Sequence, residues 1–333
     1  MSYNHLVRRR AVLATACAAL LACAIPVRAQ TYPDRPIRIV SVASPGTSID
    51  DYTRQLAKFL GDRLGQGVVV ENRPGANMIL ASDAVAKAAP DGYTLLLTSS
   101  SSMSANPFLY KKLPYDPARD FVPVARMSTL PVALVVPEQS PYKSVADLVA
   151  AARAKPGAIN AGSSSTGYRL MLAAFNEAAG IKTLDVPYKA TAGLLPDLVG
   201  GQVDYSMVEF GAALTLVQSK KLRALAVLSP KRVPLLPDVP TLSEAGMQNG
   251  GLMDAVSRTS WSGLFAPAGT PAAIVDKIGK LTLEFVNSPQ AQRHYAVRGS
   301  LPNPGTGAEL GAAVLADQQV WKRMIAVAGI QPE

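Results

Sequence analysis

The sequence predicts an α/β protein of two lobes, joined by a hinge, with a ligand cleft between them. Short apolar runs that end at turn residues alternate with helical patterns, which is typical of largely parallel sheets. After an N-terminal leader roughly 300 residues remain, more than one ordinary hydrophobic core accommodates. A stretch with four prolines, residues 229–240, excludes a helix or a central strand and indicates an extended crossover between domains.

Residues 1–29 have the pattern of a signal peptide. A basic region (8–10) precedes an apolar run (11–25), and Val27-Arg28-Ala29 predicts cleavage before Gln30. The apolar run has 15 residues, fewer than the roughly 20 that a membrane-spanning helix needs. Lipidation at Cys23, in a stretch that resembles a lipobox, is the alternative to simple cleavage, and twin-arginine export is the alternative to the general route. Each alternative predicts a periplasmic protein.

The strands and helices follow in order along the remaining chain. The strand candidates are short apolar or β-branched runs bounded by turn residues: 37–42, 68–71, 94–97, 133–136, 159–161, 183–186, 205–208 and 225–228. Helical patterns lie between them, at 50–64, 144–154, 168–179 and 192–200. We expect the chain to cross between lobes near Leu130-Pro131 and again at 230–240. The predicted domains are therefore 30–130 with 232–333, and 131–231.

The chain has few side chains that could act in catalysis or bind a metal ion. Both cysteines, Cys17 and Cys23, lie in the leader together with His5, so its removal leaves His294 as the last histidine. A disulfide or a Cys-ligated metal is then excluded, and a Ser-His-Asp triad or a His-rich zinc site would depend on His294 alone. We therefore expect a protein that is not an enzyme, with no catalytic residue, metal or cofactor.

The charge of the chain fits a small anionic partner. The leader holds four of the 33 basic residues and no acidic residue, so its removal lowers the net charge from +9 to +5. A mild positive excess suits anionic solutes, and no block of Lys and Arg resembles a nucleic-acid-binding stripe. We expect no nucleic acid as a partner.

Three loops rich in small and hydroxyl residues follow predicted strands: 44–48, 98–102 and 162–167. The first and third precede helices, whose free N–H groups hold anions, and in α/β sheets ligands lie beyond the carboxyl ends of strands. The candidate ligand-binding residues lie in or beside these loops, or directly after the strand 205–208: Ser44, Gly46, Thr47, Ser48, Asp50, Ser99, Ser100, Ser164, Ser165, Thr166, Gly167, Arg169 and Glu209.

Several of these residues also have a structural interpretation. The serines and threonines are equally suited to cap helices, and Asp50 to complement the dipole of a helix in its first turn. Arg169 is either a bidentate carboxylate ligand or half of a surface ion pair. Glu209 would repel a dianionic solute unless it were protonated, so we favour a hydrogen-bonding or peripheral role for it.

From Tyr32 almost to Glu333 the chain resembles the Bug family (TctC-like), the extracytoplasmic solute-binding receptors of tripartite tricarboxylate transporters. The most specific stretches are 69–76 (VVENRPGA), 88–95 (AAPDGYTL), 113–117 (LPYDP), 186–189 (VPYK), 236–246 (LPDVPTLSEAG) and 261–271 (WSGLFAPAGTP). The resemblance implies a two-lobed, type II-like periplasmic binding protein that closes on an organic acid. It also implies delivery of that solute to membrane permease subunits, and we expect a monomer.

The chain departs from the family pattern at four places near the expected site. Thr47 replaces the second glycine of Pro-Gly-Gly-x-x-Asp, and Asn77-Met78-Ile79 stands for Gly-Gly-Asn. Tyr168 and Arg169 replace small polar residues, and Glu209-Phe210 replaces Asp-Asn. We interpret these changes as a larger, more apolar pocket for an aromatic carboxylate or a dicarboxylate. Two other functions stay open: signalling to a membrane sensor, and an exported serine hydrolase, for which no spacing pairs a loop serine with a base.

Overall fold

The computed structural model describes residues 32–247 and 251–332. The predicted signal peptide, its cleavage site and Cys23 lie outside the described residues. By its internal contacts the chain divides into a short unit, Met1–Asp34, and one compact body, Arg35–Glu333. The architecture below is that of the body.

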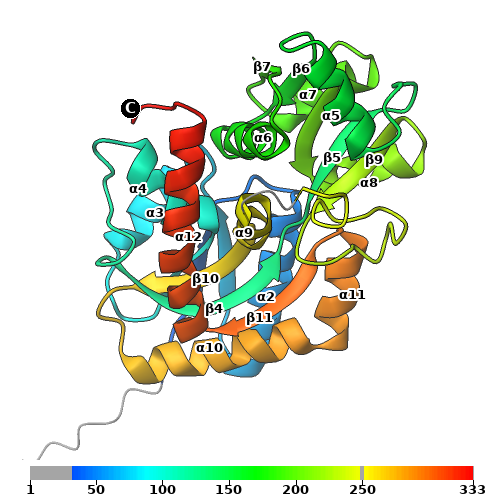
Figure 1. The fold of residues 1–333 in the computed structure, drawn as a ribbon. Helices are drawn as coiled ribbons and strands as arrows, with labels where there is room; N and C mark the ends of the chain where they lie inside the picture. The colour runs from blue at the N-terminus through cyan, green and yellow to red at the C-terminus, as the bar shows by residue number, and fades with distance from the viewer. Residues whose placement is uncertain (1–31, 248–250, 333) are drawn as a thin grey trace, which may run out of the picture. The chain divides into compact units, whose positions relative to one another are not determined.

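Within the described residues the strands form two mixed sheets (Figure 1). The six-stranded sheet has the order β11-β4-β10-β3-β1-β2, and the five-stranded sheet has the order β7-β6-β8-β5-β9. The strands are β1 (Ile37–Ser41), β2 (Val68–Asn72), β3 (Thr94–Ser99), β4 (Phe121–Thr129), β5 (Val132–Pro137), β6 (Asn160–Ser163), β7 (Leu184–Pro187), β8 (Tyr205–Glu209), β9 (Leu222–Leu228), β10 (Trp261–Pro267) and β11 (Leu301–Thr306).

Helices lie between the strands, so the chain has the α/β organisation that the sequence predicts. They are α2 (Ser48–Leu64), α3 (Ile79–Ala86), α4 (Asn106–Leu109), α5 (Val145–Ala154), α6 (Thr166–Ala179), α7 (Thr191–Val199), α8 (Phe210–Gln218), α9 (Leu252–Arg258), α10 (Ala272–Asn287), α11 (Pro289–Val297) and α12 (Gly307–Val327), with a 3-10 turn at Ala76–Met78 and a π-helical turn at Ser101–Ala105. No helix of the described ranges combines the length and the apolar run needed to cross a membrane.

The sheets are mixed rather than largely parallel. Strand β1 runs parallel to β2 and β3, and β6 runs parallel to β7 and β8. The strands next to the passages between the sheets run antiparallel: β10 to β3 and β4, and β5 to β8 and β9. The predicted parallel pattern therefore holds for the strands that are joined by helices, and it fails where the chain changes sheet.

The chain passes between the sheets at two neighbouring segments. One is Leu130-Pro131, between β4 and β5, and the other is Thr259-Ser260, between α9 and β10. The N–H of Leu130 donates to the carbonyl of Ser260 (2.8 Å), and the Ser260 hydroxyl donates to the carbonyl of Leu130 (2.6 Å). The two crossing segments are thus hydrogen-bonded to each other.

The return crossing differs from the one predicted at 230–240. That stretch stays with the five-stranded sheet, because Val227 donates its N–H to Pro240 (2.8 Å) and accepts from the N–H of Leu242 (2.9 Å). Val233 is buried in the same cluster as Val227. The prolines do exclude regular structure, but the apolar residues between them bury against β9 instead of leaving the sheet.

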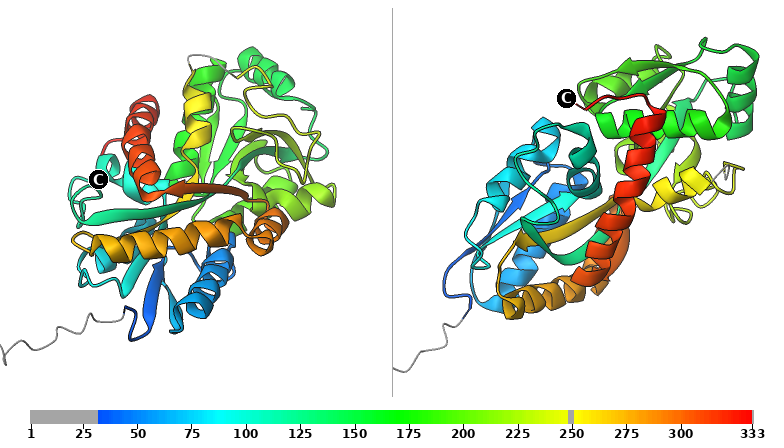
Figure 2. Two further views of the ribbon diagram at one scale, coloured as in Figure 1. Left: turned by 90° about the horizontal axis from the view of Figure 1, so that it is seen from below. Right: turned by 60° about the vertical axis from the view of Figure 1, so that its left-hand side comes forward.

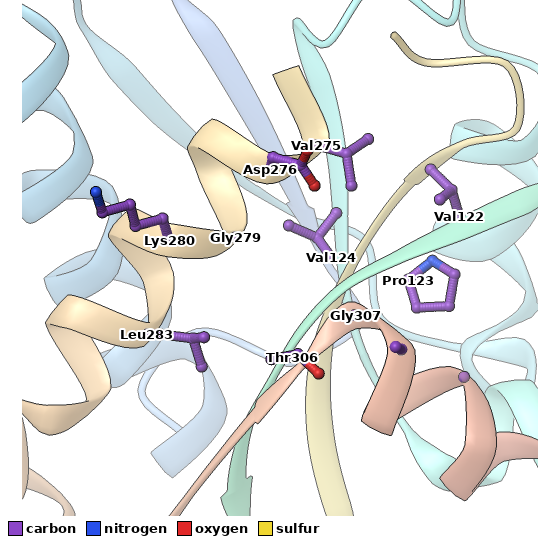
Figure 3. A pocket seen from close by; sticks show the side chains of 12 residues that line it. Val122, Pro123, Val124, Val275, Asp276, Gly279, Lys280, Leu283, Thr306 and Gly307 are labelled. Carbon is purple, nitrogen blue, oxygen red and sulfur yellow. The ribbon is translucent and has the colours of Figure 1, made fainter. Parts of the chain in front are cut away.

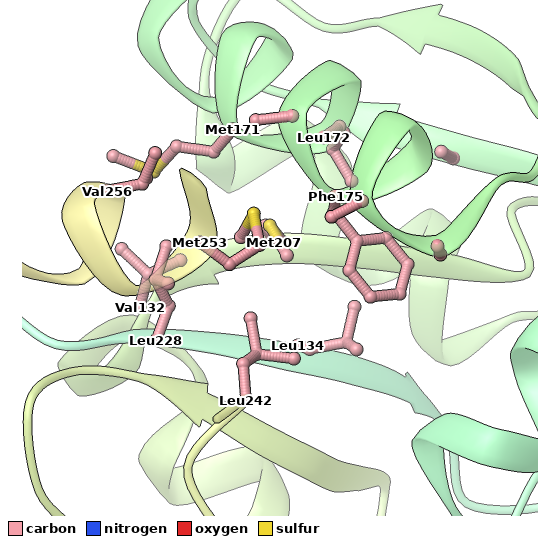
Figure 4. Packing of buried hydrophobic residues seen from close by; sticks show 14 of the residues in the cluster. Val132, Leu134, Met171, Leu172, Phe175, Met207, Leu228, Leu242, Met253 and Val256 are labelled. Carbon is pink, nitrogen blue, oxygen red and sulfur yellow. The ribbon is translucent and has the colours of Figure 1, made fainter. Parts of the chain in front are cut away.

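One apolar core lies between α6, α9 and a face of the five-stranded sheet (Figure 4). Phe175 of α6, Met207 of β8 and Val256 of α9 are fully buried there. The C-terminal part of α12 joins the same cluster through Trp321, and two further views follow α12 to its contact with α6 (Figure 2). This packing fixes the N-terminus of α6 relative to α12.

Candidate functional site

The loops after β1, β3, β6 and β8 approach one another, although they belong to different sheets. A Cβ placed on Gly167, at the start of α6, would lie 3.8 Å from the hydroxyl of Ser101, which follows β3. A Cβ placed on Gly211, at the start of α8, would lie 3.4 Å from the hydroxyl of Ser48, at the start of α2. Ser48 also hydrogen-bonds the side chain of Glu209. Residues of both sheets therefore surround one region.

Asp50 holds the first loop in shape. Its carboxylate accepts hydrogen bonds from the N–H of Gly46 (2.9 Å), from Asn72 Nδ2 (2.8 Å) and from Arg54 Nε (3.1 Å). Burial acts to raise the pKa of Asp50, but these hydrogen bonds outweigh it and keep the pKa below its usual value. Thr47 accepts from the N–H of Asp50 (3.4 Å) and caps α2. This arrangement supports the structural interpretation of Asp50.

Two serines at the end of β3 hold this end of the strand in place through hydrogen bonds. The Ser99 hydroxyl donates to the sulfur of Met78 (3.2 Å), and the Ser100 hydroxyl donates to the carbonyl of Thr259 in the crossing segment. Thr98 is fully buried, and its hydroxyl has no hydrogen-bond partner within the described ranges. Ser100 therefore ties this strand end to the passage between the sheets.

Met78 stands in a left-handed turn. Three successive residues other than glycine have positive φ: Ala76 (45°), Asn77 (51°) and Met78 (72°). Each such residue costs about 1–2 kcal/mol, so the turn needs outside support. Asn106 provides it, because its Nδ2 donates to the carbonyl of Asn77 (2.9 Å) and its Oδ1 accepts from Asn77 Nδ2 (3.3 Å). The clamp holds the thioether of Met78 against Ser99.

The third loop ends in the cap of α6. Ser165 accepts from the N–H of Tyr168 (3.4 Å), and Ser164 shares a hydrogen bond with Thr191 at the start of α7 (2.9 Å). Ser164 is buried, whereas Thr166 and Gly167 are partly exposed. The first N–H groups of a helix have no partner inside the helix, and its positive dipole end favours anions. This loop can thus donate to a solute carboxylate.

Arg169 and Glu209 have different surroundings. Arg169 Nε lies 3.0 Å from Asp185 Oδ2 on β7, in a half-exposed ion pair, so its guanidinium already has a carboxylate partner. Burial raises the pKa of Glu209, and the hydrogen bond from Ser48 opposes that rise. Burial and the charge of Glu209 both raise the pKa of Tyr168, while a hydrogen bond with the Glu209 main chain acts in the opposite direction.

Three residues near these loops were not among the candidates: Thr98, Ser101 and Thr191. The first two belong to the polar run 98–102, from which the sequence analysis took Ser99 and Ser100 as candidates. Thr191 gave a weaker signal, a hydroxyl residue directly before a helical pattern. Its contact with Ser164 joins residues far apart in the chain.

A cavity of about 670 Å³ lies elsewhere, between α10, β4 and the start of α12 (Figure 3). Its walls are mostly apolar and include none of the candidate residues: Val122, Pro123, Val124, Val275, Asp276, Gly279, Lys280, Leu283, Thr306, Gly307, Ala308 and Gly311. In residues 32–247 and 251–332, no group of three or more His, Cys, Asp or Glu side chains is placed to hold a metal ion.

Comparison with known proteins identifies relatives along nearly the whole chain. Protein BugT of Bordetella pertussis is 34% identical over 309 residues, which cover 92% of this chain and 93% of BugT. The solved structure of Rpa4515 of R. palustris with adipate is 31% identical, with a TM-score of 0.79 over 91% of this chain and 100% of the other. MatC of Rhodopseudomonas palustris with bound malate is 30% identical, with a TM-score of 0.71 over 89% and 100%.

These likenesses agree with the two-sheet α/β architecture. The model of the tripartite tricarboxylate transporter family receptor matches residues 52–330. That range contains both sheets apart from β1, and both crossing segments. The chain therefore belongs to the receptor family of the tripartite tricarboxylate transporters.

Proposed function

We propose that this protein is a periplasmic receptor that captures a carboxylate between its two lobes and presents it to permease subunits of a tripartite transporter. The observation that carries the proposal is the meeting of loops from both sheets at the N-termini of α2 and α6, through the approach of Ser101 to Gly167 and of Ser48 to Glu209. Relatives solved with adipate and with malate support a carboxylate as the solute.

Such a site needs no strong cation. A micromolar solute requires about 8 kcal/mol of net binding free energy. Helix N-termini contribute about 0.3–2 kcal/mol each, and hydrogen bonds to a charged group contribute about 1.5–3 kcal/mol each. Four or five donors from the loops 44–48, 98–102 and 162–167 therefore suffice, if closing of the lobes excludes water.

We infer that the two sheets correspond to two domains that are divided near Pro131 and near Ser260. The mutual hydrogen bonds of Leu130 and Ser260 support this hinge. A solute that contacts both lobes only in the closed state shifts the population toward that state. Both lobes come from one chain, so the receptor is proposed to act as a monomer.

The partners of three loop serines, Ser99, Ser100 and Ser164, favour binding over hydrolysis. Ser99 bonds to the sulfur of Met78, Ser100 to a carbonyl and Ser164 to the hydroxyl of Thr191. None of these groups is a base strong enough to activate a serine nucleophile. We propose that the solute leaves the receptor chemically unchanged.

The experiment is a thermal-shift and calorimetric screen of the purified protein against mono- and dicarboxylates, with two glycine variants. Gly46 and Gly65 have positive φ (83° and 68°) and open space around a Cβ, and they flank the start and the end of α2. Gly46→Ala and Gly65→Ala should each cost about 1 kcal/mol of stability.

Only Gly46→Ala should also weaken binding, because its methyl group would stand in the loop that donates to the solute. Equal affinities of the two variants would remove the first loop from the site. A wild-type protein that binds no carboxylate of the screen would contradict the proposed function itself.

A further inference from the structure

Tyr115 is a buried tyrosine in the stretch 113–117 (LPYDP), which lies outside the three loops of the candidate site. It is only 3% exposed, and its hydroxyl has partners on two segments. The hydroxyl donates to the carbonyl of Ser102 (2.8 Å) and accepts from Asn106 Nδ2 (3.1 Å). It therefore joins this stretch to the π-helical turn Ser101–Ala105 and to the start of α4.

One route from this hydroxyl runs through Asn106, which is fully buried. Asn106 Nδ2 donates to Tyr115 and also to the carbonyl of Asn77 (2.9 Å), while Oδ1 accepts from Asn77 Nδ2 (3.3 Å). A side-chain amide has two N–H donors, so both are in use and the orientation of the amide is fixed. Loss of the tyrosine hydroxyl would leave one of these buried donors unpaired, which is costly.

A second route runs through two fully buried serines. The Ser82 hydroxyl donates to the carbonyl of Met78 (3.0 Å), and its oxygen lies 2.7 Å from the hydroxyl oxygen of Ser102. Because a serine has one hydrogen to donate and that of Ser82 is used on Met78, Ser102 is the donor in the second bond. The carbonyl of Ser102 in turn accepts from Tyr115. Both routes thus end at carbonyls of the turn Ala76–Met78.

The turn Ala76–Met78 needs this support because its three residues have positive φ and none of them is glycine. Met78 is partly exposed, and its sulfur accepts from the hydroxyl of Ser99 (3.2 Å), a candidate solute ligand. The two routes of hydrogen bonds therefore decide where the Met78 side chain and the Ser99 hydroxyl lie relative to the candidate site.

Building on the proposed function, we propose that Tyr115 is a positioning residue of the solute site. Tyr115 is itself buried and touches no solute, but through Asn106 and through Ser102 it holds Met78 against Ser99. A hydroxyl that only stabilised the fold would, when removed, lower the stability and leave the solute affinity unchanged. A positioning role predicts a change at Met78 and a loss of affinity as well.

The test removes one buried hydroxyl at a time. Tyr115→Phe keeps the ring that packs edge-on against Phe121, with 5.8 Å between the ring centroids. Tyr205→Phe is the matched control, because Tyr205 is fully buried at the start of β8, where its hydroxyl donates to Asn176 Oδ1 (2.9 Å) and lies 3.1 Å from Thr183 Oγ1. Both variants should have lower melting temperatures than the wild-type protein, since each leaves buried groups unpaired.

Two measurements separate positioning from stability. Calorimetry gives the affinity for whichever of succinate, adipate and benzoate binds the wild-type protein most tightly. The ¹³C-methyl NMR signal of Met78, assigned with Met78→Leu, reports the surroundings of the thioether without any solute. Tyr115→Phe should weaken binding about fivefold or more and should shift or broaden the Met78 signal. Tyr205→Phe should leave the affinity and the signal as they are in the wild-type protein.

Ser82→Ala is a second variant, which decides the question if Tyr115→Phe fails to fold. It cuts only the route to the Met78 carbonyl and leaves the bonds of Asn106 to Asn77 in place. It should therefore shift the Met78 signal and weaken binding, but less than Tyr115→Phe does. Wild-type affinity and an unchanged Met78 signal in Ser82→Ala would count against the proposal.

Two results with Tyr115→Phe would overturn the proposal while leaving the receptor intact. One is wild-type affinity at a lowered melting temperature, because the hydroxyl would then only stabilise the fold. The other is weaker binding with an unchanged Met78 signal, since the turn would not transmit the effect. If no probe binds the wild-type protein, the proposed function itself is contradicted, and Tyr115 has no solute site to position.

Discussion

Two acidic side chains at the meeting of the loops, Asp50 and Glu209, have pKa values that are shifted in opposite directions. Asp50 is buried but accepts from Gly46, Asn72 and Arg54, so its pKa is lowered. Glu209 has the Ser48 hydroxyl as its partner, and burial raises its pKa. Hydrogen-bond donors, together with burial, therefore decide the direction in which the pKa of each carboxyl group is shifted.

A third acidic residue, Asp317 on α12, gives a prediction for the stability of the protein. Burial raises its pKa to about 6, although the hydrogen bond from Trp261 Nε1 (2.6 Å) and the charges of Arg126 and Arg258 oppose the shift. Since the folded-state pKa is above the usual 3.8, the contribution of Asp317 to stability is complete below about pH 4 and is lost as the pH rises through about 6.

Asp317→Asn keeps an acceptor for Trp261 and removes the ionisation. Its free energy of unfolding should exceed that of the wild-type protein by about 1–3 kcal/mol near pH 7.5, with little difference near pH 4. Urea unfolding at both pH values measures this. Parallel stability profiles of the two proteins across this range would show that Asp317 does not titrate there.

At the scale of single elements, the left-handed turn Ala76–Met78 stores strain next to the loops. Ala76 is exposed and has a φ of 45°, so a glycine there would lose no packing. Ala76→Gly should raise the free energy of unfolding by about 0.5–1 kcal/mol. The relief of strain exceeds this value, but part of it is offset because glycine loses more backbone entropy on folding than alanine does. Thermal unfolding measures the change. A lower melting temperature would mean that the turn is not strained in solution.

The sequence predicted the strands that have an uninterrupted apolar pattern. It missed strands whose pattern is interrupted by proline. Strands β1, β3 and β9 begin and end within a few residues of their predicted limits. Strand β4 was missed because Pro123 interrupts its pattern, and the structure places that residue at a register irregularity with β10. Strand β11 contains two prolines, which an edge strand tolerates because it lacks a partner on one side.

The same limit applied to the candidate site. Helix caps such as Thr47 and Ser165 are local, so the pattern of the sequence was enough to place them. The partners of Arg169 and Ser100 are not local: Asp185 and Thr259 reach them through tertiary folding. Sequence alone therefore identified the loops but not which of their side chains remain available to a solute.

At the scale of the whole molecule, the start of α8 is packed closely against the six-stranded part. A Cβ on Gly211 would overlap the carbonyl oxygen of Arg298, a main-chain atom that moves only at high cost. Gly211→Ala should therefore separate the two lobes locally, lower the melting temperature and weaken solute binding. Calorimetry and small-angle X-ray scattering, with and without solute, measure these effects.

Gly193→Ala is the control, because Gly193 also lies near the start of a helix but a Cβ there would meet only Tyr188 at 3.8 Å. This variant should be as stable as the wild-type protein or slightly more stable, since alanine favours helices. If both variants had the same melting temperature and the same affinity, neither stability nor solute binding would depend on the close approach at Gly211.

The hydrogen bond from Ser100 to Thr259 has a consequence for how solute binding would change the outer shape of the receptor. Ser99 and Ser100 are adjacent, so a displacement of one by an arriving molecule is transmitted to the other through a single peptide unit. Thr259 adjoins Ser260, around which the halves would pivot. In the proposed receptor, recognition and bending would in this way be mechanically joined, and changes at Ser100 are expected to alter how readily the lobes close even where every group that touches the solute is intact.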